Sequence, residues 1–418
     1  MAAPEATTDI DDATEAAIIE YLCDRRFHQS FTLPPNPAIG RKKPYRVSFA
    51  DYGDANSKAV VLFCGAFGTA RFDYWHLDLA AKRYKVRIVC PDRPGIGGSD
   101  PVDLHKRIDM WLEIVPQLLA HLNISHISLA GYSGGVVYAL STMLTYPNLL
   151  HPTKPHACLF SPWVHQSHTD ISALHAANFV PSMLISKCKS EDPTAFCDKN
   201  ISRLEKTAVV IKHAKQALRN KKPKPVLPVP PVPPVQPATH TEPKPEPQSN
   251  PEGLLGRDMK DHRITSKIRK LATSYLLAER IDGISADAQL FLKRPGTISW
   301  SSPRGIWSDL DDFVPLLMKV IEREKDAEES RYWMIHVSYA KNDDMVGEKG
   351  RIWFDSCWLR SSPRPGDMSD AETREWEKSQ SSWYYLYGTE VVPNASHNNL
   401  MRYCGRSWLK AVRQAMCD

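Results

Sequence analysis

Ser133 lies in a setting that suits a nucleophile. It is the central residue of Gly131-Tyr132-Ser133-Gly134-Gly135, which follows a short apolar run and precedes an apolar pattern with helical spacing. A G-x-S-x-G stretch between a strand and a helix is typical of a nucleophile elbow, a sharp turn that exposes the serine hydroxyl. The glycines provide the room that such a turn requires, and the N–H of Gly134 would face an oxyanion at a helix N-terminus. A glycine-rich turn with a capping serine is the alternative explanation of this stretch.

A serine hydroxyl needs a neighbouring base, and that base needs an acid to orient it. His397 lies late in the chain, in a small polar turn after a strand-like segment. Its nearest competitor, His336, falls in the middle of such a segment, where we expect its side chain to be packed. Asp343 and Asp344 follow the segment that contains His336, and either of them could be the acid.

These side chains must be positioned by an alternation of strands and helices. Short apolar segments alternate with helical patterns over the first 165 residues, and the alternation returns near residue 332. This pattern predicts an α/β protein with a mostly parallel sheet flanked by helices. The predicted strands are 45–51, 59–64, 86–90, 127–130, 157–160, 332–340 and 384–392, and the predicted helices are 14–28, 75–80, 105–121, 136–144, 347–359 and 399–416.

The middle of the chain, residues 166–325, interrupts this alternation. Helical patches are predicted at 170–188, 200–218, 265–281 and 306–326. Between them, 12 of the 29 residues from Pro223 to Pro251 are proline, so we expect a disordered segment at about 221–252. Its Lys222-x-x-Pro225-x-x-Pro228 pattern would suit an SH3-type domain, although a tether without a partner is the simpler interpretation.

Three motifs in this order resemble the α/β-hydrolase superfamily. They are Gly65-Ala66-Phe67-Gly68 after one predicted strand, Asp92-Arg93-Pro94-Gly95-Ile96-Gly97-Gly98-Ser99 after the next, and the stretch around Ser133. The resemblance implies an α/β-hydrolase fold with the core in residues 1–165 and 326–418, and a helical lid in 166–325. It also implies that Asp92 orders its own loop.

The resemblance assigns further residues. The spacing Ala340-x-x-Asp343-x-x-Val346 is similar to the family's G-x-x-D-x-x-V and favours Asp343 over Asp344 as the acid. The second oxyanion donor is by position the N–H of Ala66, with Phe67 as the alternative. Two residues depart from the family, since Cys64 replaces a histidine and Ser396 a glycine. Tyr132 and Trp163 are candidates to line the pocket, and core packing is an equal explanation for Trp163.

The predicted function is that of a serine hydrolase, which cleaves an ester or thioester of a small-molecule acyl substrate through a Ser-Asp-His triad and an acyl-enzyme. The same triad could instead hydrolyse a C–C bond or transfer an acyl group. A hydrolase-fold scaffold that recruits partners through its prolines is the non-catalytic alternative. We expect no cofactor and no metal, because the sequence has no H-E-x-x-H motif, Walker A motif or complete dinucleotide fingerprint.

Composition restricts the partners and the compartment. The net charge is +5 over 418 residues and the basic residues are scattered, which disfavours nucleic-acid binding. The nine cysteines include no C-x-x-C pair, which indicates a reducing compartment. The acidic N-terminus lacks an apolar core and no run of 18 apolar residues occurs, so we expect a cytoplasmic protein without a membrane span.

Overall fold

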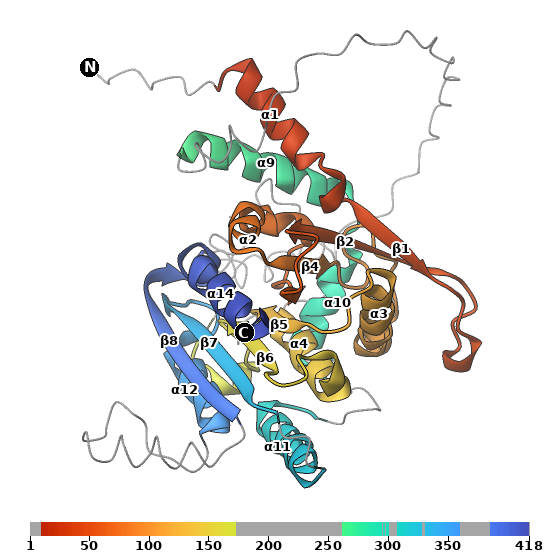
Figure 1. Ribbon diagram of the computed structural model, residues 1–418, viewed down its shortest axis with the longest axis vertical. Helices are drawn as coiled ribbons and strands as arrows, with labels where there is room; N and C mark the ends of the chain where they lie inside the picture. Colours follow the sequence, from red (N-terminus) through yellow and green to blue (C-terminus); the bar gives the residue numbers. More distant parts are fainter. Residues whose placement is uncertain are drawn as a thin grey trace, which may run out of the picture.

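The computed structural model describes residues 10–172, 261–294, 296, 298–300, 307–327, 331–359 and 385–417. Within this part of the chain, eight strands form one sheet in the order β1-β2-β4-β3-β5-β6-β7-β8 (Figure 1). The strands are β1 Gln29–Leu33, β2 Tyr45–Gly53, β3 Val60–Cys64, β4 Arg87–Pro91, β5 Ser128–Tyr132, β6 His156–Phe160, β7 Trp333–Asn342 and β8 Tyr385–Ser396.

The sheet is parallel from β4 to β8, and its β1–β2 end is antiparallel. Every residue of β3, β5 and β6 is buried. This explains their continuous apolar sequences, since a central parallel strand has helices on both of its faces. The predicted mostly parallel sheet flanked by helices is therefore confirmed.

Successive residues of β3 enter two different hydrophobic cores, as the pleat of a strand requires. Leu62 and Cys64 belong to the core that includes residues of α3, α4, α11 and α12, whereas Val61 and Phe63 belong to the core that includes residues of α1, α2, α9 and α14. These helices are α1 Asp12–Leu22, α2 Asp78–Tyr84, α3 Arg107–His121, α4 Gly135–Thr145, α9 His262–Ala278, α11 Leu310–Asp326, α12 Gly347–Trp358 and α14 Leu400–Cys417.

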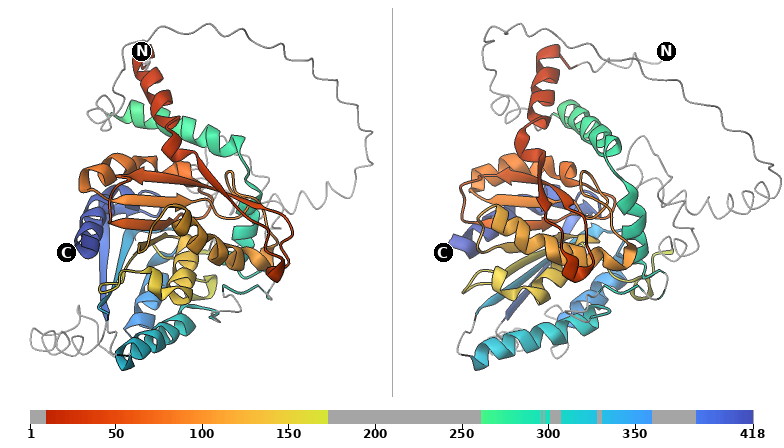
Figure 2. Two further views of the ribbon diagram at one scale, coloured as in Figure 1. Left: turned by 45° about the vertical axis from the view of Figure 1, so that its right-hand side comes forward. Right: turned by 90° about the vertical axis from the view of Figure 1, so that its right-hand side faces the viewer.

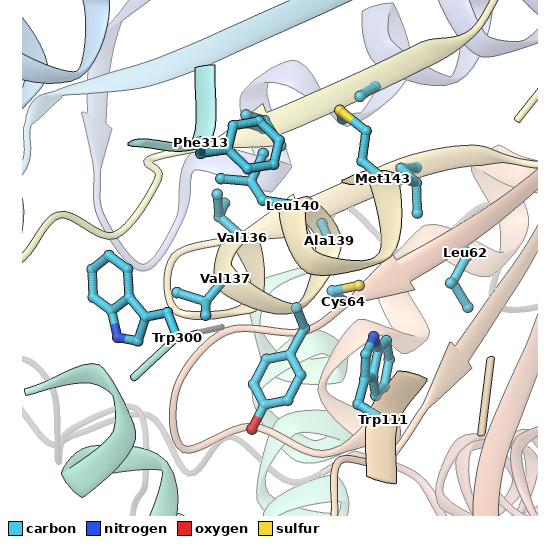
Figure 3. Close-up of a cluster of buried hydrophobic side chains, with 14 of the residues drawn as sticks. Leu62, Cys64, Trp111, Val136, Val137, Ala139, Leu140, Met143, Trp300 and Phe313 are labelled. Atoms are coloured by element: carbon cyan, nitrogen blue, oxygen red, sulfur yellow. The ribbon is translucent and has the colours of Figure 1, made fainter. Parts of the chain in front are cut away.

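Helix α4, which follows the elbow, is enclosed by apolar side chains. Its residues Val136, Val137, Leu140 and Met143 lie between side chains of β3 and α3 and side chains from beyond residue 290 (Figure 3). The latter include Trp300 and Phe313, which are 2% and 0% exposed. The segment between β6 and β7 therefore contributes to the hydrophobic core that surrounds α4.

From residue 261 onward, the described part of that segment runs along the outside of the sheet. Helices α9, α10 (Asp282–Phe291) and α11 lie one after another around one side of the molecule (Figure 2). Backbone hydrogen bonds join it to the loop after β4: Gly97 N donates to Arg280 O (2.8 Å), and Arg280 N donates to Gly97 O (3.1 Å).

Several element boundaries differ from the prediction. Strand β1 was not predicted, because it is an edge strand whose exposure alternates and only Leu33 is fully buried. The first helix ends at Leu22, where Asp24 caps a short 3-10 helix at Arg25–Phe27. The patches at 170–188 (beyond residue 172) and 200–218 and the proline-rich segment at 221–252 lie outside the described residues. In the described ranges, no helix has both the length and the apolar character needed to cross a membrane.

Gly135 provides a test of how α4 packs on β3. A Cβ at this position would lie 2.1 Å from Cys64 O and 2.4 Å from Gly65 O, both backbone atoms. We expect Gly135→Ala to lower the free energy of unfolding by about 3 kcal/mol, because strand and helix must separate to admit the methyl group. Urea denaturation followed by circular dichroism measures this change.

Gly296→Ala is the matched control, since no atom lies within 4 Å of a Cβ at that position. It should change the free energy of unfolding by less than about 0.5 kcal/mol. Equal stabilities of the two variants would show that α4 does not approach β3 this closely.

Candidate active site

Ser133 occupies a strained turn between β5 and α4. Its φ is 51°, a left-handed value that side chains other than glycine rarely adopt. The turn requires glycine on both sides of Ser133. A Cβ at Gly131 would lie only 2.9 Å from Val136 Cα, and a Cβ at Gly135 would collide with the end of β3. The expected need for glycine at these two positions is confirmed.

A chain of hydrogen bonds joins Ser133 to His397 and Asp343. With the proton on Nδ1, the imidazole of His397 donates to Asp343 Oδ1 at 2.9 Å. Its Nε2 then accepts from the Ser133 hydroxyl at 2.9 Å. The three residues come from the ends of β5, β7 and β8, so the sheet brings together groups that are more than 260 residues apart. Both Ser133 and His397 are buried, at 2% and 3% exposure.

The carboxylate of Asp343 is held in its charged form. Burial alone would raise its pKa, but the charge of His397 and hydrogen bonds from His397, the Val346 N–H and the Ser161 hydroxyl bring the pKa below its usual value. The N–H groups of Met345 and Val346 donate to Oδ1 at 3.0 and 2.8 Å. An ionised acid beside Nδ1 is what the imidazole needs if it is to accept a proton at Nε2.

Tyr132 also contacts His397. Its hydroxyl donates to the backbone carbonyl of His397. The two rings are stacked with their centroids 5.9 Å apart. The residue before Ser133 thus orients the loop that carries the histidine, a role that the prediction of Tyr132 as a pocket residue did not include.

The predicted oxyanion donor at Ala66 has to be corrected. The Ala66 N–H donates to the hydroxyl of Tyr74 at 2.6 Å, so this hydrogen is already engaged within the core. The next N–H along the loop, that of Phe67, makes no hydrogen bond within the part of the chain that the structure describes. Position in the sequence could not reveal this, because Tyr74 reaches Ala66 only through the fold of the loop.

The other histidine and aspartates that the sequence offered are not part of this hydrogen-bond chain. His336 lies within β7 beside His156, with ring centroids 5.7 Å apart. Asp344 is exposed. Asp92 accepts hydrogen bonds from the Arg71 N–H (2.7 Å) and the Ser48 hydroxyl (2.6 Å), so its carboxylate connects its loop to β2 and to the segment at Arg71.

A buried ionic network next to the site escaped the sequence analysis. Asp287 of α10 accepts hydrogen bonds from Arg93 Nε (2.6 Å), Arg107 Nε (3.1 Å) and the Tyr138 hydroxyl (2.7 Å). Arg93 in turn donates to Ala66 O at 2.7 Å and to Gly65 O. The inserted helix is therefore tied to the same loop that carries Phe67. The one signal in the sequence is an aspartate among the apolar residues of Ile284-Ser-Ala-Asp-Ala-Gln-Leu-Phe291.

The charge of Asp287 depends on its partners. Burial alone would raise the pKa of its carboxyl group, but Arg107 and Arg93 bring that pKa below its usual value.

Among the described residues, no cluster of histidine, cysteine or acidic side chains has an arrangement suited to a metal ion.

Comparison with known proteins gives structural neighbours. No protein-family model and no curated protein sequence matches the chain. A thermophilic esterase from Thermogutta terrifontis is 14% identical, with 92% of this chain and 97% of that chain covered and a TM-score of 0.46. An epoxide hydrolase from Vigna radiata is also 14% identical, with 93% and 97% covered and a TM-score of 0.44.

A haloalkane dehalogenase from Paraglaciecola agarilytica is 14% identical as well, with 93% of this chain and 91% of that chain covered and a TM-score of 0.43. The three names describe different reactions, so the likeness concerns the fold and selects no reaction for this chain. The sheet, the elbow after β5 and the chain order of serine, aspartate and histidine are those of the α/β-hydrolase fold.

Asp287→Asn tests the ionic network. The variant leaves Arg93 and Arg107 buried, at 3% and 1% exposure, without their carboxylate. We expect the free energy of unfolding at pH 7 to fall by about 3–5 kcal/mol, as is usual when one member of a buried ion pair is removed. Because the pKa of Asp287 is lowered in the folded state, this stabilisation is present above the unfolded pKa and is lost as the pH falls through the folded one.

Asp282→Asn, at the first residue of the same helix, is the matched control. Its side chain is 73% exposed and lies 3.5 Å from Arg280. Its loss should change the free energy of unfolding by less than about 1 kcal/mol. Similar effects of the two variants in urea denaturation would contradict a buried ionic role for Asp287.

Proposed function

We propose that this protein, which has the α/β-hydrolase fold, is a serine hydrolase that cleaves the ester or thioester bond of a small-molecule substrate through an acyl-enzyme. The observation that carries the proposal is the unbroken hydrogen-bond chain from Ser133 through His397 to Asp343, with 2.9 Å at each link. This arrangement can remove a proton from a hydroxyl that is otherwise a poor nucleophile.

In the first half of the reaction, Ser133 Oγ forms a bond to the acyl carbonyl carbon while its proton passes to His397 Nε2. The N–H groups of Gly134 and Phe67 stabilise the negative charge on the carbonyl oxygen. Asp343 stabilises the imidazolium. The proton on Nε2 then passes to the alcohol or thiol as its bond to the carbonyl carbon breaks.

In the second half, water takes the place of the departed alcohol or thiol. It gives a proton to His397 Nε2 as its oxygen attacks the acyl-enzyme. The bond between the acyl carbon and Ser133 Oγ then breaks, and the proton on Nε2 returns to Ser133. The products are a carboxylic acid and the free enzyme.

Acyl transfer is a second candidate, and the burial of the site favours it. Ser133 and His397 are 2% and 3% exposed, so an acyl-enzyme here would be largely shielded from bulk water. An alcohol or amine would then accept the acyl group in the position that water occupies in hydrolysis. C–C bond hydrolysis by the same triad would require a carbanion as the leaving group, and no contact in the described residues specifically favours it.

Labelling with a fluorophosphonate probe tests for an activated serine. The wild type should become labelled, and Ser133→Ala and His397→Ala should not, because one lacks the nucleophile and the other the base. Asp343→Asn should lower the labelling rate strongly, since the corresponding change in a serine protease lowers kcat by about 10⁴-fold. In-gel fluorescence over time gives these rates.

Asp344→Asn is the matched control for the acid and should label at nearly the wild-type rate. Circular dichroism establishes that each variant is folded. If the folded wild type is not labelled, the protein is a hydrolase-fold scaffold rather than an enzyme of this type. If it is labelled, acyl esters supplied with water alone or with an added alcohol distinguish hydrolysis from acyl transfer by their products.

A further inference from the structure

The space above Gly134 is filled by a side chain from the insertion. A Cβ at Gly134 would lie 2.3, 2.5 and 2.9 Å from three carbon atoms of the Phe291 ring. The ring of Phe291 thus occupies the position that a side chain directly after the nucleophile would take. Gly134 is the residue whose N–H we assign to the oxyanion, so this ring borders the place where the carbonyl carbon reacts.

Aromatic neighbours fix the orientation of this ring. Phe67, in the loop after β3, meets it edge to face with centroids 6.0 Å apart. Trp163 and Tyr138 lie at 5.9 and 6.3 Å. The Trp163 indole N–H also donates to the backbone carbonyl of Phe291 at 3.2 Å. With 1% exposure, Phe291 has little freedom to rotate away.

Helix α10 itself is fixed to the core. Asp287, one turn before Phe291, is held by Arg93, Arg107 and Tyr138. At the start of the helix, Gly283 N donates to Gly95 O at 2.8 Å. Moving α10 outward would break buried ion pairs, so the helix is a permanent wall of the site rather than a hinged cover. This differs from a lid that opens for each substrate.

We infer that Phe291 is the residue that determines acyl-chain length in this enzyme and that it restricts the acyl group to short chains. The inference rests on the proposed function. The acyl chain is bonded to the carbonyl carbon whose oxygen we assign to Gly134, and the Phe291 ring lies directly over that residue. We therefore expect the ring to exclude long acyl chains and to leave esters of two to four acyl carbons as the preferred substrates.

The test compares p-nitrophenyl esters of acetate, butyrate and octanoate. The wild type should have a higher kcat/KM for acetate than for octanoate. In Phe291→Ala the ratio of octanoate to acetate kcat/KM should rise roughly tenfold or more, and in Phe291→Leu by less, since one methylene group in an apolar pocket discriminates about 10- to 200-fold. The ratio does not depend on the fraction of protein that is correctly folded.

Phe313→Ala is the matched control. Phe313 is also a buried phenylalanine of the insertion, at 0% exposure, but its ring contacts are Trp307 and Trp358. It should destabilise the fold without changing the ratio. A second series with one acyl group and leaving alcohols of increasing size should be unaffected by Phe291→Ala.

Gly134→Ala adds an independent measurement. Alone it should lower acetate kcat/KM at least roughly tenfold, because the methyl group collides with the Phe291 ring and displaces the oxyanion donor. The double variant with Phe291→Ala should recover most of that loss. Recovery supports direct contact at the site.

An unchanged acyl ratio in Phe291→Ala and Phe291→Leu would overturn the inference, as would an altered preference for the leaving alcohol alone. These outcomes are distinct from failure of the proposed function. In that case neither the wild type nor any Phe291 variant would react with a fluorophosphonate or with an ester.

Discussion

The left-handed backbone of Ser133 is the constraint on which the rest of the site depends. A serine at a φ of 51° is strained, and the surrounding structure must hold it there. Gly131 and Gly135 make this possible, because α4 then passes within contact distance of β3. Because glycine has no side chain, these residues leave space around the turn. Phe291 fills that gap above Gly134, so the inserted helix and the elbow depend on each other.

Buried charge explains how the insertion stays in place. Asp287 bonds to Arg93 and Arg107, and a second set of contacts joins Arg71 to Glu279 at the end of α9, with Nη2 2.6 Å from Oε1. Asp287, Arg93 and Arg107 are nearly fully buried and costly to leave unpaired, so α10 cannot leave the core without a large loss of free energy. Arg93 also donates to the backbone carbonyls of Gly65 and Ala66. The same arginine thus sets the position of the insertion and of the loop after β3.

His397 is positioned through both its imidazole and its backbone. Its imidazole is bonded to Asp343, and its backbone carbonyl accepts from Tyr132, the residue before the nucleophile. The Tyr132 side chain therefore joins the segment around Ser133 to the His397 backbone, in addition to the direct hydrogen bond between the Ser133 and His397 side chains. Such double support favours one rotamer and one tautomer, which a general base requires.

Local sequence patterns were enough to predict the parallel core, the elbow at Ser133 and the late His397, whereas the choice of Asp343 over Asp344 needed the family resemblance and the geometry of the structure. Continuous apolar runs mark buried strands, and polar residues after such strands meet at one edge of the sheet. Two features follow from tertiary packing, namely the engagement of the Ala66 N–H and the side chain that covers Gly134. Ala66 is engaged by Tyr74 at 2.6 Å, and Phe291 arrives from 157 positions further along the chain. Both contacts join segments whose packing no local pattern specifies, since many apolar and aromatic residues would satisfy the same periodicity.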